Sequence, residues 1–458
     1  MTAGERDLSS FKAYDIRGRV PEQIDEELAR LIGRAFADLV KPRRVAVGRD
    51  MRLSGPALAV ALTRGLCEAG VDVVDLGEVG TEEVYFATFS LGLDGGVMVT
   101  ASHNPAEYNG MKFVREKGIP VSGDTGLQQM SEWVRGALTA GAPPFAPSGG
   151  KVTAADIMPS YVEHLLGYAD PQRLRPLKIV ADGGDGMAGP VIRRLQEHLP
   201  FEFVLLNETP DGTFPNGVPN PLLPEKRAVT AAAVRENGAD LGLAWDGDFD
   251  RCFFFDEHGE FVEGYYLVGL LAQQALARAP GSAIVHDPRL IWNTIELVEQ
   301  AGGRPVENKS GHAFIKERMR REDAVYGGEM SAHHYFREFS YCDSGMITWL
   351  LVAQLMSVTG RSLSELVGER IARYPVSGEL NLELPDAAAA LARLRVRYEA
   401  DAPRVDEIDG LSLEFPRWRV NVRSSNTEPV VRVNLETRAD SELLREKTEE
   451  VLAVLRGA

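Results

Sequence analysis

Short apolar runs alternate with segments of helical spacing along most of the chain. Residues 44–47, 71–76 and 97–99 are rich in valine and predict strands. Residues 55–69, between the first two runs, carry the spacing of a helix. Alternation of this kind favours an α/β fold built on parallel strands.

The same pattern continues in later blocks and then changes. A second block begins near residue 177 and ends in the apolar run 241–245, and a third begins near Gly264. A Pro-, Ala- and Gly-rich passage at residues 139–150 separates the first two blocks and is typical of a linker. After about Tyr374 alternating strands precede a terminal helix at residues 441–456, which predicts a smaller α+β domain.

A serine lies at the end of one predicted strand. Ser102 follows the apolar run 96–99, and Pro105 excludes a continuation of that strand. The sheet holds such a serine with its hydroxyl free to project, as a covalent nucleophile or a phosphoryl carrier requires. Small polar residues before Asn-Pro are also typical of an ordinary turn, so both interpretations stay open at this point.

Three aspartates alternate directly after the apolar run 241–245. Asp246, Asp248 and Asp250 can converge on a hard divalent cation such as Mg²⁺, which prefers oxygen ligands. An EF-hand calcium loop is excluded, because its sixth position is Gly and this segment has Arg251 there. A solvated acidic turn is the alternative interpretation.

Two further loops are dense in polar side chains. Glu329, Ser331 and His333 stand at alternate positions, so in extended chain they can face one way and hydrogen-bond sugar hydroxyls. The neighbouring sequence holds no further His or Cys cluster, so a zinc site is not indicated. Arg423 is followed by small hydroxyl and amide donors, a composition that suits phosphate binding and also occurs in plain polar loops.

The net charge of −17 excludes classes of partner. A nucleic-acid backbone would meet a repulsive field, so we expect no nucleic-acid partner. A phosphate-ester substrate would need a local cluster of basic residues, for which Arg17, Lys112, Arg289 and Lys309 are available.

Compartment follows from what the sequence does not contain. The three cysteines, Cys67, Cys252 and Cys342, are widely spaced, and so indicate neither a disulfide framework nor a zinc site. The polar N-terminus does not have the apolar core of a signal peptide, and no stretch is apolar enough to span a bilayer. We expect a cytoplasmic enzyme with no membrane partner; the oligomeric state stays open.

Taken together and in this order, the four loops resemble those of the α-D-phosphohexomutase superfamily along essentially the whole chain. Within it the chain looks most like the bacterial phosphomannomutases, chiefly through residues 326–337 and 211–217. The resemblance implies four domains around a central cleft: three related α/β domains with mixed sheets, at residues 1–149, 150–254 and 255–373, and a C-terminal α+β domain at residues 374–458.

An activity is implied by the same resemblance. Mannose 6-phosphate and mannose 1-phosphate would be interconverted reversibly through a phosphorylated Ser102 and a hexose 1,6-bisphosphate, which also serves as activator. Mg²⁺ would be held by Asp246, Asp248, Asp250 and the Ser102 phosphate. Phosphoryl transfer requires mainly positioning and charge neutralisation from a protein, which agrees with these residue types.

Further site residues are implied in the same way. The catalytic candidates are Ser102, Lys112, Arg17, His103, His333 and Arg251. The substrate-binding candidates are Tyr14, Arg289, Lys309, Ser310, His312, Glu329, Ser331, Arg423, Ser425, Asn426 and Thr427.

Sugar preference is the point on which the sequence leaves alternatives. Met330 and His333 argue against the phosphoglucosamine and glucose-only types, but position 289 is Arg where relatives with dual activity tend to carry Lys. Dual phosphomannomutase/phosphoglucomutase activity is therefore the near alternative. A metal-dependent phosphatase and a non-catalytic sugar-phosphate binding protein are more distant ones.

Overall fold

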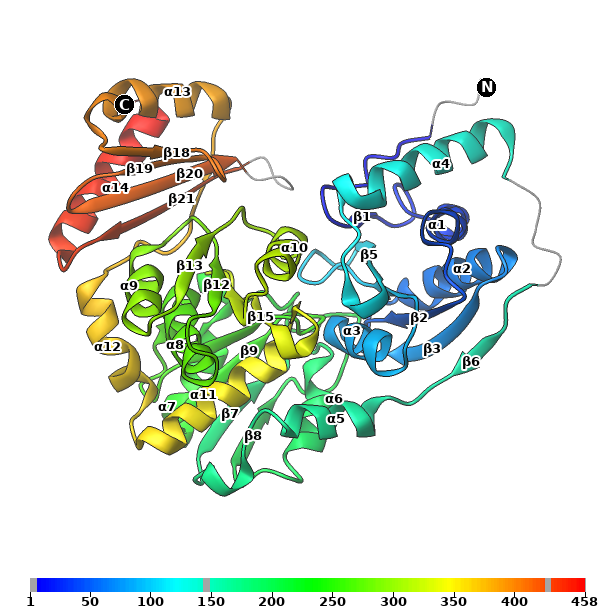
Figure 1. Ribbon diagram of the computed structural model, residues 1–458, viewed down its shortest axis with the longest axis horizontal. Coiled ribbons are helices and arrows are strands. Elements are labelled where there is room, and N and C mark those ends of the chain that lie inside the picture. The colour runs from blue at the N-terminus through cyan, green and yellow to red at the C-terminus, as the bar shows by residue number, and fades with distance from the viewer. Residues whose placement is uncertain (1–5, 143–148, 425–429, 458) are drawn as a thin grey trace. The chain divides into compact units, whose positions relative to one another are not determined.

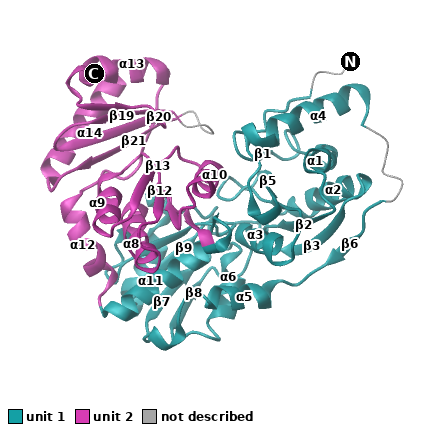
Figure 2. Cartoon of the chain, viewed as in Figure 1, with its two compact units in different colours: residues 1–261, 338–360 teal, residues 262–337, 361–458 magenta. Residues whose placement is uncertain are grey.

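The computed structural model describes residues 6–142, 149–424 and 430–457 (Figure 1). The chain forms two compact units, residues 1–261 with 338–360 and residues 262–337 with 361–458 (Figure 2). In the part of the chain that the structure describes, no helix has both the length and the apolar character needed to cross a membrane.

The first unit begins with a mixed sheet in the strand order β1-β5-β4-β2-β3-β6. Its strands are β1 (Ile16–Arg19), β2 (Arg44–Arg49), β3 (Asp72–Glu78), β4 (Gly95–Val99), β5 (Tyr108–Arg115) and β6 (Val152–Ala154). Its helices are α1 (Glu26–Val40), α2 (Gly55–Glu68), α3 (Thr81–Ser90) and α4 (Gln128–Ala140). Apolar faces of α1 and α2 bury Leu28 and Leu62 against Val45, Val73 and Val97 of the sheet.

A second sheet follows in the same unit, with β8, β7, β9 and β10 side by side in that order. The strands are β7 (Lys178–Asp182), β8 (Glu202–Leu206), β9 (Leu241–Trp245), β10 (Cys252–Phe255) and β11 (Phe261–Val262), at which the chain leaves the unit. The helices are α5 (Met158–Leu166), α6 (Ala188–Leu195), α7 (Ala228–Asn237) and, after the short strand β16 (Cys342–Asp343), α11 (Gly345–Thr359). Trp349 of α11 packs edge-on against Phe201 and Phe203, which ties this later helix to the first unit.

The second unit contains a third mixed sheet, in which β13, β12, β14 and β15 lie in that order. Its strands are β12 (Ala283–His286), β13 (Arg304–Glu307), β14 (Tyr326–Gly328) and β15 (His334–Phe336). Its helices are α8 (Gly264–Arg278), α9 (Trp292–Gln300), α10 (His312–Glu322) and α12 (Leu363–Arg373).

The C-terminal part of the second unit has an entirely antiparallel sheet, in the order β17-β21-β20-β19-β18. Its elements are β17 (Leu380–Glu383), α13 (Ala387–Tyr398), β18 (Arg404–Asp406), β19 (Leu411–Glu414), β20 (Trp418–Ser424), β21 (Val430–Thr437) and α14 (Ser441–Arg456). Val420, Val433 and Leu455 form part of its own core, so this domain has a separate hydrophobic centre.

The three mixed sheets share one arrangement of four strands. The orders β3-β2-β4-β5, β8-β7-β9-β10 and β13-β12-β14-β15 are equivalent, and in each sheet the last strand runs antiparallel to the one before it. The loop between those two strands is residues 100–107 in the first sheet, 246–251 in the second and 329–333 in the third. Three of the polar loops therefore occupy equivalent positions in three related sheets.

The predicted fold class is confirmed, as three related α/β domains with mixed sheets and a C-terminal α+β domain. The predicted strands 44–47, 71–76 and 97–99 correspond to β2, β3 and β4, and the predicted helix 55–69 corresponds to α2. The predicted linker 139–150 begins within α4, which ends at Ala140, and its residues 143–148 lie outside the described residues.

Candidate active site

Ser102 is held in an unusual backbone conformation. The residue is buried and has φ 50°, in the left-handed region that residues with a Cβ seldom adopt. Its N–H donates to Thr100 Oγ1 at 2.8 Å, and its Oγ donates to Asp246 Oδ2 at 2.9 Å. The Oγ also lies 3.0 Å from His103 Nδ1. Backbone strain at a reactive side chain is typical of functional sites.

The three aspartates of the β9–β10 loop form a compact, buried cluster. Asp246, Asp248 and Asp250 are 0–2% exposed, and each offers an oxygen within 4.8 Å of the others. Asp248 Oδ1 is buried with no hydrogen-bond partner among the described residues. An oxygen-only donor set with an unsatisfied buried carboxylate oxygen fits a hard divalent cation.

Lys112 of β5 supplies the positive charge of this cluster. Its Nζ lies 2.7 Å from Asp248 Oδ2 and 2.6 Å from Asp250 Oδ2. Burial lowers the pKa of Lys112, but the two carboxylates outweigh burial and raise it above its usual range. Burial likewise raises the pKa of Asp248, yet Lys112 holds it well below its usual range. In this arrangement the lysine is an ammonium and the aspartate a carboxylate.

Two arginines flank the serine. Arg251 places its Nε and Nη2 at 2.8 and 2.7 Å from Asp246 Oδ2, and Nη2 also donates to His103 Nδ1 at 2.5 Å. Arg17 of β1 donates to Asp15 and, at 2.7 Å, to Asn104 Oδ1 of the serine loop. Tyr14 lies near Arg17 and contributes, with Asp15, to raising the pKa of its guanidinium against the effect of burial. The first unit thus brings the serine, three carboxylates and three cations into one site.

A threonine of this site was missed by sequence reasoning. Thr81, at the first turn of α3, donates its Oγ1 to Asp248 Oδ2 at 2.5 Å and its N–H to the Asp248 carbonyl at 3.1 Å. Its Thr-Glu-Glu context is typical of a helix start and gives no sign of a partner 167 residues away.

In the second unit, Arg289 gathers the predicted sugar-binding residues. Its guanidinium lies 2.8 Å from Asp287, 3.3 Å from Glu379 and 3.6 Å from Glu329, and it donates to Ser331 Oγ at 3.1 Å. Burial lowers the pKa of Arg289, but Asp287, Glu379 and Glu329 outweigh burial and raise it. Asp287 and Glu379 were not predicted, since each stands in a segment without a motif.

Glu329 itself is fixed by two donors. Its Oε2 accepts from Tyr335 at 2.5 Å, and its Oε1 accepts from the Gly311 N–H at 2.8 Å. The rings of His312 and Tyr335 both lie close to His333, with centroids 6.3 and 6.1 Å away. The carboxylate is therefore oriented before any ligand arrives.

The predicted phosphate-binding residues are placed in part. Arg423 lies 3.3 Å from Glu379 and 3.9 Å from Asp409, and Asp409 also accepts from the Ser310 N–H at 3.3 Å. Lys309 lies over the ring of Phe314 at 4.8 Å. The predicted residues Ser425, Asn426 and Thr427 lie outside the described residues.

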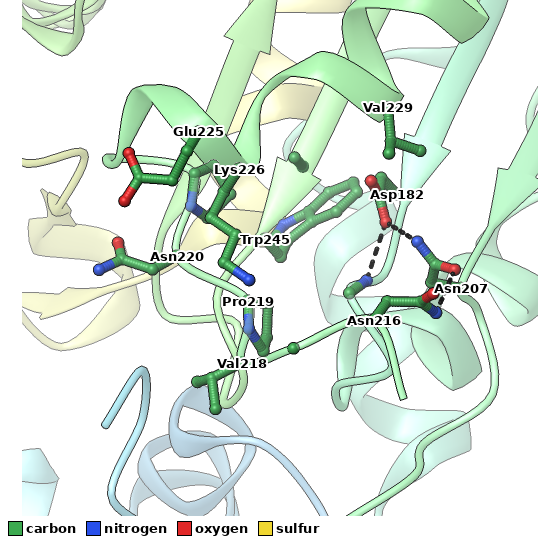
Figure 3. Close-up of a pocket in the computed structure, with 14 residues that line it drawn as sticks. Asp182, Asn207, Asn216, Val218, Pro219, Asn220, Glu225, Lys226, Val229 and Trp245 are labelled. Atoms are coloured by element: carbon green, nitrogen blue, oxygen red, sulfur yellow. Dashed lines mark hydrogen bonds between the residues drawn. The ribbon is translucent and has the colours of Figure 1, made fainter. Parts of the chain in front are cut away.

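A small cavity lies beside the acidic loop in the first unit. It has a volume of about 160 Å³ and is lined by Asp182, Asn207, Asn216 and Trp245, the residue before Asp246 (Figure 3). Asp182 accepts from Asn207 at 2.9 Å and from Thr230 at 2.7 Å, so its carboxylate is already engaged within the protein. The cavity brings none of the predicted site residues together.

The buried side chain of Glu83, on the same helix as Thr81, predicts how the free energy of unfolding depends on pH. Burial raises the pKa of Glu83 to about 8, and its Oε2 accepts from the Gly80 N–H at 2.7 Å. Between about pH 4.3 and this pKa the folded chain keeps a proton that the unfolded chain has lost, so this group lowers the free energy of unfolding as pH rises. Glu83→Gln stays neutral and should remove that slope, which is at most about 1.4 kcal/mol per pH unit.

Urea unfolding of both proteins at several pH values checks this expectation. Glu26→Gln, an exposed first-turn glutamate of α1, serves as control and should leave the slope as in the wild type. Equal slopes for Glu83→Gln and the wild type would contradict a neutral, buried Glu83.

Comparison with known proteins gives one consistent family. Four domains described as phosphoglucomutase/phosphomannomutase match the chain: α/β/α domain I at residues 8–132, domain II at 159–259, domain III at 263–374 and the C-terminal domain at 379–454.

Individual relatives cover nearly the whole chain. A protein of Xanthomonas campestris pv. campestris named "Phosphohexose mutases" is 57% identical over 450 residues, 98% of this chain and 100% of its own length. A phosphomannomutase of Escherichia coli is 55% identical over 456 residues, 98% and 99% of the two chains. The crystal structure of a phosphoglucomutase/phosphomannomutase family protein from Burkholderia thailandensis has a TM-score of 0.86 at 35% identity and covers 98% of each chain.

Proposed function

The chain belongs to the phosphoglucomutase/phosphomannomutase family, and we propose that it interconverts mannose 6-phosphate and mannose 1-phosphate. The observation that carries the proposal is the buried Ser102 hydroxyl, 2.9 Å from Asp246 in a cluster of three aspartates. The 55% identity to a relative named phosphomannomutase supports mannose as the sugar.

Ser102 is the phosphoryl carrier in this proposal. The free hydroxyl of the substrate attacks the phosphorus of phosphoserine 102, the bond from phosphorus to Oγ breaks, and the hydroxyl proton passes to a base. The resulting hexose 1,6-bisphosphate turns round, and Oγ attacks its other phosphorus. The sugar oxygen leaves with a proton, so the serine is phosphorylated again and the phosphate count is unchanged.

Asp246, Asp248 and Asp250 would hold Mg²⁺ beside the serine, since their oxygens converge and one of them is unsatisfied. The bound cation would neutralise charge on the transferring phosphoryl group. Arg251 is positioned to neutralise further charge there, because its guanidinium is fixed between Asp246 and His103.

Proton transfer at the sugar hydroxyl is assigned to Arg17, Lys112 and His333, and His103 would orient the Ser102 hydroxyl. Lys112 and Arg17 are both cations, because neighbouring carboxylates outweigh burial and raise the pKa of each above its usual range. In this charge state both groups can donate hydrogen bonds to the departing oxygen, and neither can accept the proton of the attacking hydroxyl.

The second unit would bind the substrate. Glu329 and Ser331 present oxygens to the sugar hydroxyls, and Arg289 keeps both of them oriented. Arg423, Ser425, Asn426 and Thr427 would bind the phosphate that does not react. Lys309, Ser310 and His312 would line the same substrate site. The positive charges among these side chains would attract a phosphorylated hexose locally, although the net charge of −17 repels it over the molecule as a whole.

Reaction conditions complete the proposal. Hexose 1,6-bisphosphate should activate the enzyme by phosphorylating Ser102. We place the protein in the cytoplasm, since the widely spaced Cys67, Cys252 and Cys342 do not indicate a disulfide framework.

A paired substrate assay tests the proposal. We expect kcat/KM for mannose 1-phosphate to exceed that for glucose 1-phosphate, with bisphosphate and Mg²⁺ present. Equal values would replace the strict mannose assignment by dual phosphomannomutase/phosphoglucomutase activity, which the name of the Xanthomonas relative favours. Free phosphate released in proportion to turnover would instead indicate a metal-dependent phosphatase.

A further inference from the structure

A buried arginine outside the predicted site contacts the serine loop through its guanidinium. Arg52 follows β2 and is 1% exposed. Its Nη1 donates to the carbonyls of Pro105 and Tyr108 at 2.8 Å each, and its Nη2 donates to those of Ser102 at 2.9 Å and Asn104 at 2.6 Å. One rigid, planar group therefore binds four carbonyl oxygens along the loop between β4 and β5.

The backbone N–H of Ser102 is connected to Arg52 through Thr100 and Asp50. Asp50 lies 3.4 Å from the Arg52 Nε and accepts from Thr100 Oγ1 at 2.6 Å. Thr100 Oγ1 in turn accepts the Ser102 N–H. Asp50 and Arg52 thus hold the N–H and the carbonyl of Ser102 from one buried ion pair, which maintains its φ of 50°.

A segment of the second domain covers this ion pair. Residues 211–217 approach through an isolated bridge between Arg52 and Gly212, and the Phe214 ring lies 5.1 Å from the guanidinium. A Cβ on Gly212 would come within 2.1 Å of the Met51 carbonyl, so only glycine permits this approach. The arginine cannot turn away from the loop without displacing this cover.

We propose that Arg52 is a positioning residue for phosphoryl transfer, which fixes the Ser102 backbone so that Oγ stays aligned with the acidic cluster. The inference rests on the proposed function, because it assigns Arg52 a role in the chemistry of Ser102. The hydrogen bonds of the Arg52 guanidinium described above go to the loop backbone, and its ion pair is with Asp50, so it acts through Ser102. A displacement of about 1 Å at a reacting atom lowers a rate by about 10²-fold.

Two variants separate this role from general stability. Arg52→Lys keeps the charge that neutralises Asp50. A single ammonium group, however, cannot donate the four hydrogen bonds that diverge from the two guanidinium nitrogens. Arg52→Ala leaves a space that free guanidinium ion can enter. Arg34→Ala is the matched control, since Arg34 is also a buried arginine of the first domain, on α1 and over the ring of Trp133.

Kinetics give the first readout. We expect Arg52→Lys to lower kcat by about 10²-fold with an unchanged KM for mannose 1-phosphate. Millimolar guanidinium chloride should restore part of the activity of Arg52→Ala and none of any activity lost by Arg34→Ala. Wild-type kcat in Arg52→Lys would overturn the proposal. So would a loss in Arg52→Ala that guanidinium does not restore and that Arg34→Ala equals.

Hydrogen exchange gives a readout that does not depend on the sugar. The Ser102 amide and its neighbours up to residue 108 should exchange faster in Arg52→Lys than in the wild type, with exchange in β2 and β4 unchanged. Identical exchange in the loop would overturn the proposal. If the wild type turns over no mannose phosphate, the proposed function fails, and this exchange result still decides whether Arg52 holds the loop.

Discussion

Replacement of Ser102 by alanine should lower kcat for mannose 1-phosphate by more than about 10⁴-fold, to the level of a chain with no carrier group. The reason is chemical, because the methyl group of alanine cannot form a bond to phosphorus. Steady-state turnover with bisphosphate and Mg²⁺ measures this effect. Intact-protein mass spectrometry should show at the same time that the variant accepts no phosphoryl group.

Ser122→Ala controls for the loss of a buried serine in the same domain. Ser122 is 1% exposed and contacts Thr125 at 3.0 Å, away from the acidic loop in sequence and in its contacts. We expect its activity to equal that of the wild type. Turnover by Ser102→Ala comparable with that of Ser122→Ala would refute the carrier role.

Removal of the metal should have the second-largest effect. Chelation with EDTA should abolish activity, and added Mg²⁺ should restore it, because the transferring phosphoryl group would otherwise face three carboxylates. Asp248→Asn keeps the shape of the side chain but lowers its charge. We expect Asp248→Asn to lower kcat by about 10³-fold, which corresponds to a loss of several kcal/mol of transition-state stabilisation, and to require a higher Mg²⁺ concentration for activity.

Asp256→Asn is the control for the acidic cluster. Asp256, 7% exposed after β10, accepts backbone N–H groups of His258 and Glu260 and has a local structural role. Its Mg²⁺ dependence should match that of the wild type. An Asp248→Asn variant with an unchanged Mg²⁺ requirement would contradict a metal site at this loop.

Much of the architecture follows from local patterns. Apolar runs of four to seven residues, each bounded by turn residues, identify β2, β3 and β9. Buried parallel strands carry apolar residues such as valine and leucine on both faces, which produces such runs. The antiparallel strands β5, β10 and β15 were not singled out, although each follows a polar loop. Their pairing partner is set by the three-dimensional path of that loop, which residue spacing does not encode. The domain boundaries at 149, 254 and 373 stay predictions.

The site divides in the same way. The residue types of the serine and acidic loops indicate their chemistry from short motifs, as at Ser102 and Asp248. Thr81 and Arg52 carry no motif, and their partners lie about 50 to 170 residues away along the chain. The Arg52 contacts depend on the path of the loop between β4 and β5 within the first sheet domain, and the Thr81 contact forms only when the first two sheets pack together, so the sequence alone reveals neither.

The fate of the phosphoryl group is the most direct test of this account. The unphosphorylated protein should be mixed with hexose 1,6-bisphosphate, and both Ser102 phosphorylation and free phosphate should be followed in the same sample. We predict that Ser102 gains one phosphoryl group, that mannose 1-phosphate or mannose 6-phosphate then removes it as bisphosphate, and that almost no phosphate is released. An unmodified Ser102, or phosphate released with every turnover, would contradict it.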